Sequence, residues 1–386
     1  MMRDIYFDNS ATTALSEGVK RAMTEAMEVY GNPSSLHSSG LAAEKMMREA
    51  RKSIGEALGL RSFRDGQLVF TSCGSEANNL ALLGSALAKE RRTANKIITT
   101  DSEHPSVENT LRQLEAKGFD VVRIPTAGGV LDMERLKDEA EGVFLASIMM
   151  VNNETGAVYD VENAFKTIKA KSPDAICHCD AVQGFMKRPF SAGTLNADLI
   201  TLSAHKIHGP KGVGALYIDP DMLKKKKIVP YIHGGGQEFG LRSGTENTIG
   251  IVGFGQAVKE SFASLEKSIS HMSELRRYIA ENLPDEIRIN EPRGERAPHI
   301  LNITLPRIKS ETMLHYLSAK GIFVSSGSAC SSHSGTPSSS LVAFGLTPKE
   351  ADCSLRISLC SENTREQADA LCVTLGEGLK TLVRIR

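Results

Sequence analysis

The chain has 386 residues, and its 46 Lys and Arg residues balance its 46 Asp and Glu residues, so the formal charge is zero. A neutral chain gives no reason to expect direct nucleic-acid binding or an anionic membrane as the main partner. The composition, 41% hydrophobic and 24% charged, is typical of a soluble globular protein, and at about 150 residues per domain the length predicts two or three domains.

The seven cysteines cannot all pair in disulfides, because their number is odd. In a chain of this size they are expected to be free thiols in a reducing compartment. The N-terminal residues contain no long apolar run that would indicate a signal peptide. No stretch approaches the roughly 20 apolar residues of a membrane helix. We therefore expect a cytoplasmic protein without a membrane anchor.

From about residue 67 to residue 218, short apolar runs alternate with amphipathic segments. The runs are continuous rather than alternating, as in strands that are buried on both faces. Helical patterns separate several of them, for example over 75–88 and 104–116. This order predicts an α/β domain with a mainly parallel central sheet. The expected strands cover 67–71, 96–100, 120–124, 143–150, 175–179, 198–203 and 213–218.

A second region begins near residue 258. Apolar residues spaced three and four apart from Val258 to Leu283 predict one long amphipathic helix. A final helix opens on the capping-box pattern Thr364-x-x-Gln367. This part is typical of a smaller α+β domain. Between these two helices we expect strands over 300–305, 322–325 and 355–359, and a helix near 311–319.

Segment 325–340 reads SSGSACSSHSGTPSSS, and nine of its sixteen residues are Ser. Such a segment cannot pack a core and is expected to form a mobile loop. Cys330 within it would then be accessible as a nucleophile. The alternative is an incidental surface cysteine.

Polar groups follow a predicted strand at Ser203, His205 and Lys206. Sites in α/β sheets gather at the carboxyl ends of strands. Ser203 and His205 are two residues apart, so on an extended backbone they would point the same way and could bind one anion, while Lys206 points elsewhere. A lysine among apolar residues can form a Schiff base with an aldehyde. The alternative is a lysine that only reaches from a strand end into solvent.

Two further turns carry candidate groups. Gly74 and Ser75 lie between a strand and a helix, where free N–H groups attract phosphate, although a plain capped helix has the same pattern. His104 follows another strand and could stack on a flat cofactor or move protons. A structural histidine is the alternative.

Cys177, His178, Cys179 and Asp180 end a further strand. We expect no metal site there, because the cysteines share one strand face while His178 and Asp180 share the other. A carboxylate at a strand end can instead hold the proton of a pyridinium ring, as pyridoxal phosphate (PLP) requires. Asp180 could also simply cap the next helix.

Together these residues resemble the cysteine desulfurases, the NifS/IscS family within the class V aminotransferases of fold-type I PLP enzymes. The similarity runs through nearly the whole chain, and the serine-rich cysteine loop resembles the branch with a long mobile loop. The matching segments are YFDNSATT (6–13), GNPSSLHSSG (31–40), EHP (103–105), VNNETG (151–156), HCDAVQ (178–183), SAHKIHGPKGVG (203–214), HGGGQEFGLRSGTEN (233–247), SSGSACSS (325–332) and LRISL (355–359).

The resemblance implies a homodimeric PLP enzyme with a large cofactor-binding domain (16–257) and a small domain (1–15 and 258–386) that carries the loop 325–340. It would convert L-cysteine to L-alanine and pass the sulfur as a persulfide to acceptor proteins. The implied roles are catalysis by Lys206, Cys330 and His104; cofactor binding by Lys206, Asp180, Gln183, His104, Gly74, Ser75, Ser203 and His205, with Thr245 reaching the phosphate in the partner subunit; and substrate binding by Asn153 and Arg356.

Some features depart from the family pattern. Cys73, beside the phosphate turn, and Cys360 stand where glycine is usual. The chain ends at Arg386 without the tail that docks the iron–sulfur scaffold in the housekeeping branch, which weakens the case that it supplies that scaffold.

Three alternatives remain: a selenocysteine lyase, a catalytically silent sulfur-relay or scaffold protein of the same fold, and a metal-binding protein built on Cys177, His178 and Cys179. The destination of the sulfur is open among iron–sulfur cluster assembly, tRNA thiolation and other thio-cofactor synthesis.

Overall fold

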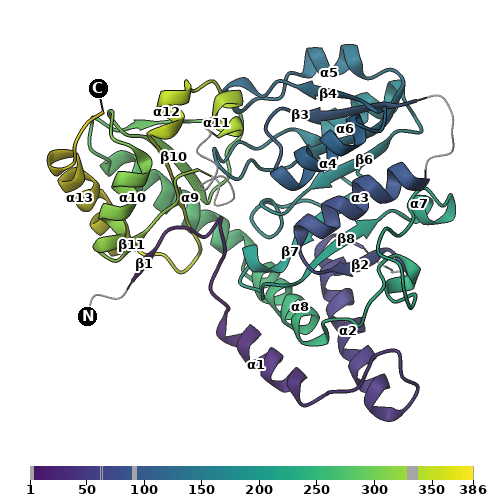
Figure 1. Ribbon diagram of the computed structural model, residues 1–386. Helices are drawn as coiled ribbons and strands as arrows, with labels where there is room; N and C mark the ends of the chain where they lie inside the picture. Colours follow the sequence, from purple (N-terminus) through teal and green to yellow (C-terminus); the bar gives the residue numbers. More distant parts are fainter. Residues whose placement is uncertain (1–3, 61, 63, 89–93, 328–337, 386) are drawn as a thin grey trace.

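The structure, a computed structural model, describes residues 4–60, 62, 64–88, 94–327 and 338–385. Its central feature is a seven-stranded sheet made of β2 (Leu68–Thr71), β3 (Lys96–Thr100), β4 (Asp120–Ile124), β5 (Val143–Met149), β6 (Ile176–Asp180), β7 (Leu199–Ser203) and β8 (Gly214–Ile218). The strand order is β2-β8-β7-β6-β5-β3-β4 (Figure 1). Only β8 runs antiparallel to its neighbours. The predicted α/β class with a mainly parallel sheet is therefore confirmed.

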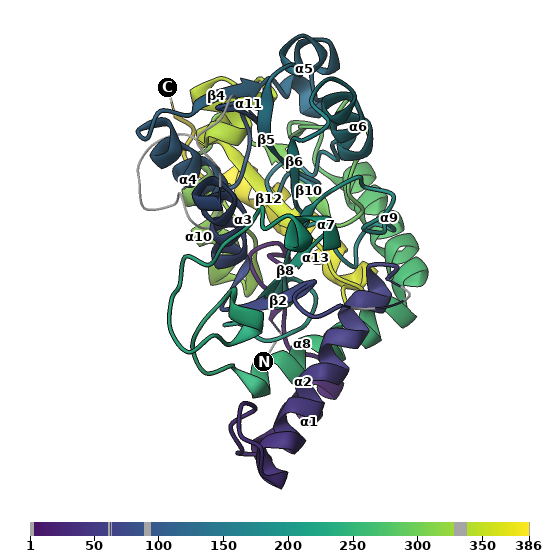
Figure 2. The same cartoon turned by 90° about the vertical axis from the view of Figure 1, so that its right-hand side faces the viewer.

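Helices cover both faces of this sheet, which explains why its strands are apolar without alternation. Helices α3 (Gly74–Ala88) and α4 (Pro105–Glu115) pack on one face through a core that includes Leu80 and Leu111. Helices α5 (Met133–Glu139) and α6 (Val161–Lys171) pack on the other, where Phe165 is fully buried. Helix α7 (Pro220–Lys224) follows β8, and in the view of Figure 2 it lies in front of the sheet.

The predicted long helix over 258–283 is wrong. The structure has two helices, α8 (Thr248–Ala263) and α9 (Leu265–Asn282), which meet at Ser264, where φ is −113° and ψ is 9°. The apolar periodicity runs across the break because each helix has its own buried stripe. Val258 belongs to the core of the large sheet, whereas Met272 belongs to a second core. Helices α1 (Glu17–Met27) and α2 (Ser38–Ala57) pack against α8.

A smaller part lies beside the large sheet (Figure 1). Its strands β9 (Arg288–Ile289), β10 (Ile300–Thr304) and β12 (Ser354–Ser358) form an antiparallel sheet in the order β12-β10-β9. The short β1 (Ile5–Tyr6) pairs in parallel with β11 (Ile322–Phe323), so the strand predicted over 322–325 is shorter than expected. The helices are α10 (Ser310–Ala319), α11 (Ser339–Phe344), α12 (Pro348–Asp352) and α13 (Arg365–Thr381).

The last helix, α13, begins as predicted. Thr364 and Gln367 form the reciprocal capping box, in which each side chain binds the backbone N–H of the other residue. The pattern was readable because a capping box is set by local sequence alone. Among the described helices, none is long and apolar enough to cross a membrane.

The domain boundaries remain a proposal. Phe7 is fully buried in the second core together with α9, α10 and α13, which supports joining residues 1–15 to the C-terminal part. A boundary after residue 257 would cut α8, whose Phe254, Ala257 and Val258 belong to the core of the large sheet. We therefore propose Ser264, where α8 ends, as the boundary.

Candidate active site

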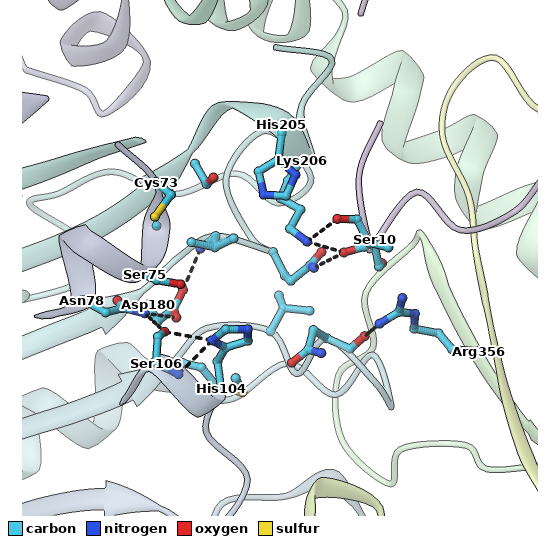
Figure 3. A pocket seen from close by; sticks show the side chains of 18 residues that line it. Ser10, Cys73, Ser75, Asn78, His104, Ser106, Asp180, His205, Lys206 and Arg356 are labelled. Atoms are coloured by element: carbon cyan, nitrogen blue, oxygen red, sulfur yellow. Dashed lines mark hydrogen bonds between the residues drawn. The ribbon is translucent and has the colours of Figure 1, made fainter. Parts of the chain in front are cut away.

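The carboxyl ends of the parallel strands meet at one edge of the large sheet, where sites of α/β proteins form. Strand β6 ends at Asp180 and β7 ends at Ser203, and α3 begins at Gly74 shortly after β2. A cavity of about 230 Å³ opens there (Figure 3). Ten of the predicted site residues line it: Gly74, Ser75, His104, Asn153, Asp180, Gln183, Ser203, His205, Lys206 and Arg356.

Lys206 points into this cavity. After β7 the chain passes through a 3-10 turn, Ala204–Lys206, so the strand alternation expected for Ser203, His205 and Lys206 is wrong, and all three line the cavity. The Lys206 Nζ donates to the carbonyl oxygens of Ser10 at 2.6 Å and Ala11 at 2.8 Å (Figure 3). The N-terminal segment therefore holds the lysine amine at the cavity.

Asp180 is anchored by Asn78, which projects from α3. The Asn78 amide donates one hydrogen to Asp180 Oδ2 at 2.7 Å and the other to Ser106 Oγ at 2.9 Å. The backbone N–H of Val182 donates to Asp180 Oδ1 at 3.0 Å. The carboxylate at the cavity is thus oriented by donors to both oxygens. The alternative that Asp180 caps a following helix is wrong, because residues 181–198, between β6 and β7, contain no helix.

His104 continues the same network. It is the N-cap of α4, and its Nδ1 accepts from the backbone N–H of Ser106 at 3.1 Å and lies 2.8 Å from Ser106 Oγ. Because a backbone N–H can only donate, Nδ1 is unprotonated and a neutral ring carries its hydrogen on Nε2. Burial lowers the His104 pKa and Lys206 lowers it further, against the opposing effect of Asp180. The imidazole is therefore a neutral group poised at the cavity wall (Figure 3).

The start of α3 and Ser203 form a polar cradle on the cavity wall. The Ser203 Oγ is buried and has no hydrogen-bond partner among the described residues. A Cβ on Gly74 would stand 3.0 Å from Val182 Cγ2, so glycine permits the close packing of this turn. Burial, reinforced by neighbouring lysines, lowers the His205 pKa to about 4, so its ring is neutral at pH 7. Cys73 borders the same cradle.

Arg356 lies on the opposite side of the cavity and is 1% exposed. Its Nη1 donates to the Asn153 carbonyl oxygen at 2.9 Å and its Nη2 donates to Asp8 Oδ1 at 2.7 Å. Its Nε is buried, and no described residue is its hydrogen-bond partner. A buried cationic donor without an acceptor is costly unless a ligand supplies one, so this arginine suits a carboxylate ligand.

Two predicted residues are not placed in the cavity. Thr245 is exposed and does not line it. Cys330 lies outside the described residues, as does most of the predicted mobile loop.

Among the described residues, no group of His, Cys, Asp and Glu side chains could hold a metal ion, and this includes Cys177, His178 and Cys179. Burial raises the pKa of the Cys177 and Cys179 thiols. His178 bonds Ser147 and Thr201, whereas Asp180 bonds Asn78.

The sequence analysis missed several groups at this site. Asn78 lies four residues after Gly74, and this spacing places both on one face of a helix, so the periodicity of α3 could have identified it. The Ser10 and Ala11 carbonyls could not have been found this way, because they are backbone groups that reach Lys206 from 195 residues away or more.

Comparisons with known proteins agree with this geometry. Residues 5–371 match the model of the family described as aminotransferase class-V. The chain is 39% identical over 387 residues to a protein named cysteine desulfurase from Trichormus azollae, covering 99% of this chain and 94% of that protein.

Solved structures are also similar. A NifS-like protein superposes with a TM-score of 0.90 at 37% identity, covering 98% of this chain and all of the other. A structure described as SspA in complex with cysteine superposes with a TM-score of 0.78 at 34% identity, covering 93% of this chain and 99% of the other.

Proposed function

Because the chain belongs to the class-V aminotransferase family and acts within it as a cysteine desulfurase in sulfur transfer, we propose that the cavity at Lys206 is its active site. The observation that carries this assignment is the convergence of an amine, a carboxylate, a neutral imidazole and a buried arginine on one cavity. The residue roles below are proposals that rest on this arrangement.

The residues present fit PLP. The partnerless Ser203 Oγ, the start of α3 at Gly74 and the neutral His205 ring offer donors for a phosphate. Asp180 offers a carboxylate for the ring nitrogen, and Lys206 offers the amine that binds the aldehyde. When bound, this cofactor supplies an electron sink that acidifies the Cα–H of an amino acid.

Each polar residue around the cofactor then has a task toward L-cysteine. Arg356, through its partnerless Nε, binds the substrate carboxylate, and Asn153 lies beside it. The Lys206 amine takes the proton from the substrate Cα. His104, held neutral by burial, moves protons on the substrate or on the attacking thiol. The SspA structure described as a complex with cysteine supports the choice of substrate.

Cys330 is proposed to accept the sulfur. Its thiolate attacks the substrate sulfur, so that an S–S bond forms and the substrate C–S bond breaks with its electron pair left on carbon. Protonation of that carbon and return of a proton from the Lys206 amine to Cα give L-alanine. The persulfide on Cys330 then passes to an acceptor protein. Because Cys330 must be a reduced thiol before it can attack the substrate sulfur, we propose a cytoplasmic location.

Thr245 supports the proposal of a homodimer. It is exposed and lies outside the cavity of its own chain, as a residue that serves the site of a second copy must be. Size-exclusion chromatography with light scattering tests this proposal, and a monomer at micromolar concentration would contradict it.

The purified protein tests the cofactor site directly. We expect a yellow protein that forms alanine from cysteine, and a Lys206→Ala variant that lacks the visible band of lysine-bound cofactor. Lys211→Ala is the matched control, since Lys211 is exposed five residues away and should keep the band. A colourless wild-type protein that takes up no added PLP would overturn the assignment.

A second experiment tests the sulfur acceptor. Cys330→Ser should keep the visible band and lose persulfide formation, with the wild-type persulfide mapped by peptide mass spectrometry. A modified peptide that carries Cys73 in place of Cys330, or unchanged sulfide release in the variant, would show that the nucleophile is wrong.

A further inference from the structure

His299 precedes β10 and is completely buried. Its Nε2 lies 3.3 Å from Oε1 of Gln183, a residue of the cavity wall that is 116 positions away in the chain. The Gln183 Nε2 in turn donates to the Ser10 carbonyl oxygen at 2.9 Å. The same carbonyl accepts from Lys206 Nζ at 2.6 Å. A continuous hydrogen-bonded chain thus joins His299 to the lysine.

The direction of each bond in this chain follows from its Ser10 end. A carbonyl oxygen only accepts, so the NH₂ group of Gln183 faces Ser10 and the Oε1 faces His299. The imidazole must then carry its hydrogen on Nε2, which leaves Nδ1 unprotonated. Consistently, Nδ1 is buried and has no hydrogen-bond partner within the part of the chain that the structure describes. One NH₂ hydrogen of Gln183 goes to Ser10, and the other remains for a ligand in the cavity.

The surroundings keep His299 in this neutral form. Burial lowers its pKa far below the usual value, and the positive charges of Lys187, Arg356 and Lys206 act in the same direction. A second proton on Nδ1 would place a charge in a dry, already positive region without an acceptor. The ring is therefore a fixed single donor to Gln183 across the physiological pH range.

We propose that His299 is a positioning residue that holds the Gln183 amide with its NH₂ group toward the cavity and toward the carbonyl shared with Lys206. This inference rests on the proposed PLP site, where Gln183 would donate to the ring hydroxyl. Without the His299 Nε2–H, Oε1 of Gln183 would be a buried acceptor without a donor. A rotation of the amide that exchanges its oxygen and its NH₂ group would then become more favourable.

Two variants distinguish a positioning role of His299 from a role in which its ring only fills space. His299→Phe keeps a planar ring but has no donor, whereas His299→Gln restores an N–H. We expect the Phe variant to bind PLP about tenfold more weakly, the loss expected when one buried group loses its partner. Its visible band should also titrate at a pH different from the wild-type value. The Gln variant should recover both properties.

His271→Phe is the matched control. His271 lies on α9, and its Nε2 is 2.8 Å from the carbonyl oxygen of Asn363, so the substitution removes a hydrogen bond away from the cavity. It should leave PLP affinity and the band titration unchanged.

A double substitution tests whether His299 affects PLP binding through Gln183. In a Gln183→Ala protein the amide is gone, so adding His299→Phe should change PLP affinity by less than twofold. A full tenfold further loss would show that His299 does not act through Gln183.

The cofactor-free protein gives a readout that does not involve PLP. Nitrogen NMR of the histidine side chains should show His299 neutral at pH 7, with the hydrogen on Nε2; the signal is assigned by its loss in His299→Gln. An imidazolium or an Nδ1–H form would overturn the inference, as would a folded His299→Phe protein with wild-type PLP affinity and titration. Wild-type protein that binds no PLP would instead overturn the proposed function.

Discussion

At the residue scale, the site is marked by polar atoms that are buried without partners. In the described parts of the chain, Ser203 Oγ and Arg356 Nε have no hydrogen-bond partner, and both residues line the cavity. Such atoms are rare in folded proteins because each one costs free energy. Here they lie where an anionic phosphate and a carboxylate are proposed to bind, so the ligand would satisfy them.

Glu103, next to His104, gives a prediction at this scale. It is 5% exposed, and burial raises its pKa to about 8. Its Oε1 accepts from Thr100 Oγ1 and from the Met149 N–H, each at 2.8 Å. The pKa of Glu103 is higher in the folded protein than in the unfolded chain. The contribution of protonated Glu103 to the free energy of unfolding is therefore fully present below about pH 4.5 and is lost as the pH rises through 8.

Glu103→Gln should remove this pH dependence, because a neutral amide accepts the same two bonds. Urea unfolding should show that the stability of the wild type relative to the variant falls between pH 5 and pH 8 with a slope approaching about 1.4 kcal/mol per pH unit. Glu141→Gln, at an exposed position, is the control. Parallel profiles for wild type and Glu103→Gln would contradict the prediction.

Strand-end residues were predictable because their placement follows from local pattern. Asp180 and Ser203 each close a buried apolar run, and parallel strands bring such ends together. The position of the Lys206 side chain could not be predicted, because a 3-10 turn follows β7 in place of the extended backbone that the alternation assumes. Nor could His299 be assigned, since its partner Gln183 is distant in sequence.

At the element scale, helix boundaries show the same limit. The start of α13 was readable from Thr364 and Gln367, which need only each other. The break between α8 and α9 could not be predicted from the sequence, because the apolar spacing continues through Ser264. Only the separation of the two cores distinguishes two helices from one.

The start of α4 allows the structural and chemical roles of His104 to be separated. As N-cap, its side chain accepts from Ser106 N, and asparagine is also a favourable cap. His104→Ala should lower the free energy of unfolding by about 1 kcal/mol, whereas His104→Asn should leave it nearly unchanged. Both variants should lose alanine formation.

Urea unfolding of the cofactor-free proteins and an alanine assay provide the two measurements. An Asn variant with wild-type turnover would show that the ring of His104 serves only as a cap.

At the scale of the whole molecule, Arg356 joins three distant segments. From β12 it binds Asp8 in the N-terminal segment and the Asn153 carbonyl in the loop after β5. No local pattern predicts this junction, because Asp8 and Arg356 are 348 residues apart. The family motifs suggested the residues of the site, and the fold supplies their contacts.

Arg356→Lys tests the substrate role of this junction. A lysine keeps the positive charge but loses the planar guanidinium donors that match a carboxylate. We expect KM for cysteine to rise at least tenfold, while the visible band of bound PLP is kept, since Arg356 lies across the cavity from the proposed phosphate cradle. Steady-state kinetics and absorption spectra measure both, and an unchanged KM would exclude Arg356 from substrate binding.

The N-terminal segment has a consequence for the order in which the protein is made. Residues near Ser10 leave the ribosome long before those of β12, yet the Ser10 N–H donates to Ser358 Oγ, 348 residues later, and β1 pairs with β11. A nascent chain that already contains Lys206 can form the bonds from Gln183 and His205 to this segment, but it lacks those from Ser358 and β11. The cavity is complete only after translation has passed β12, because that strand supplies Arg356.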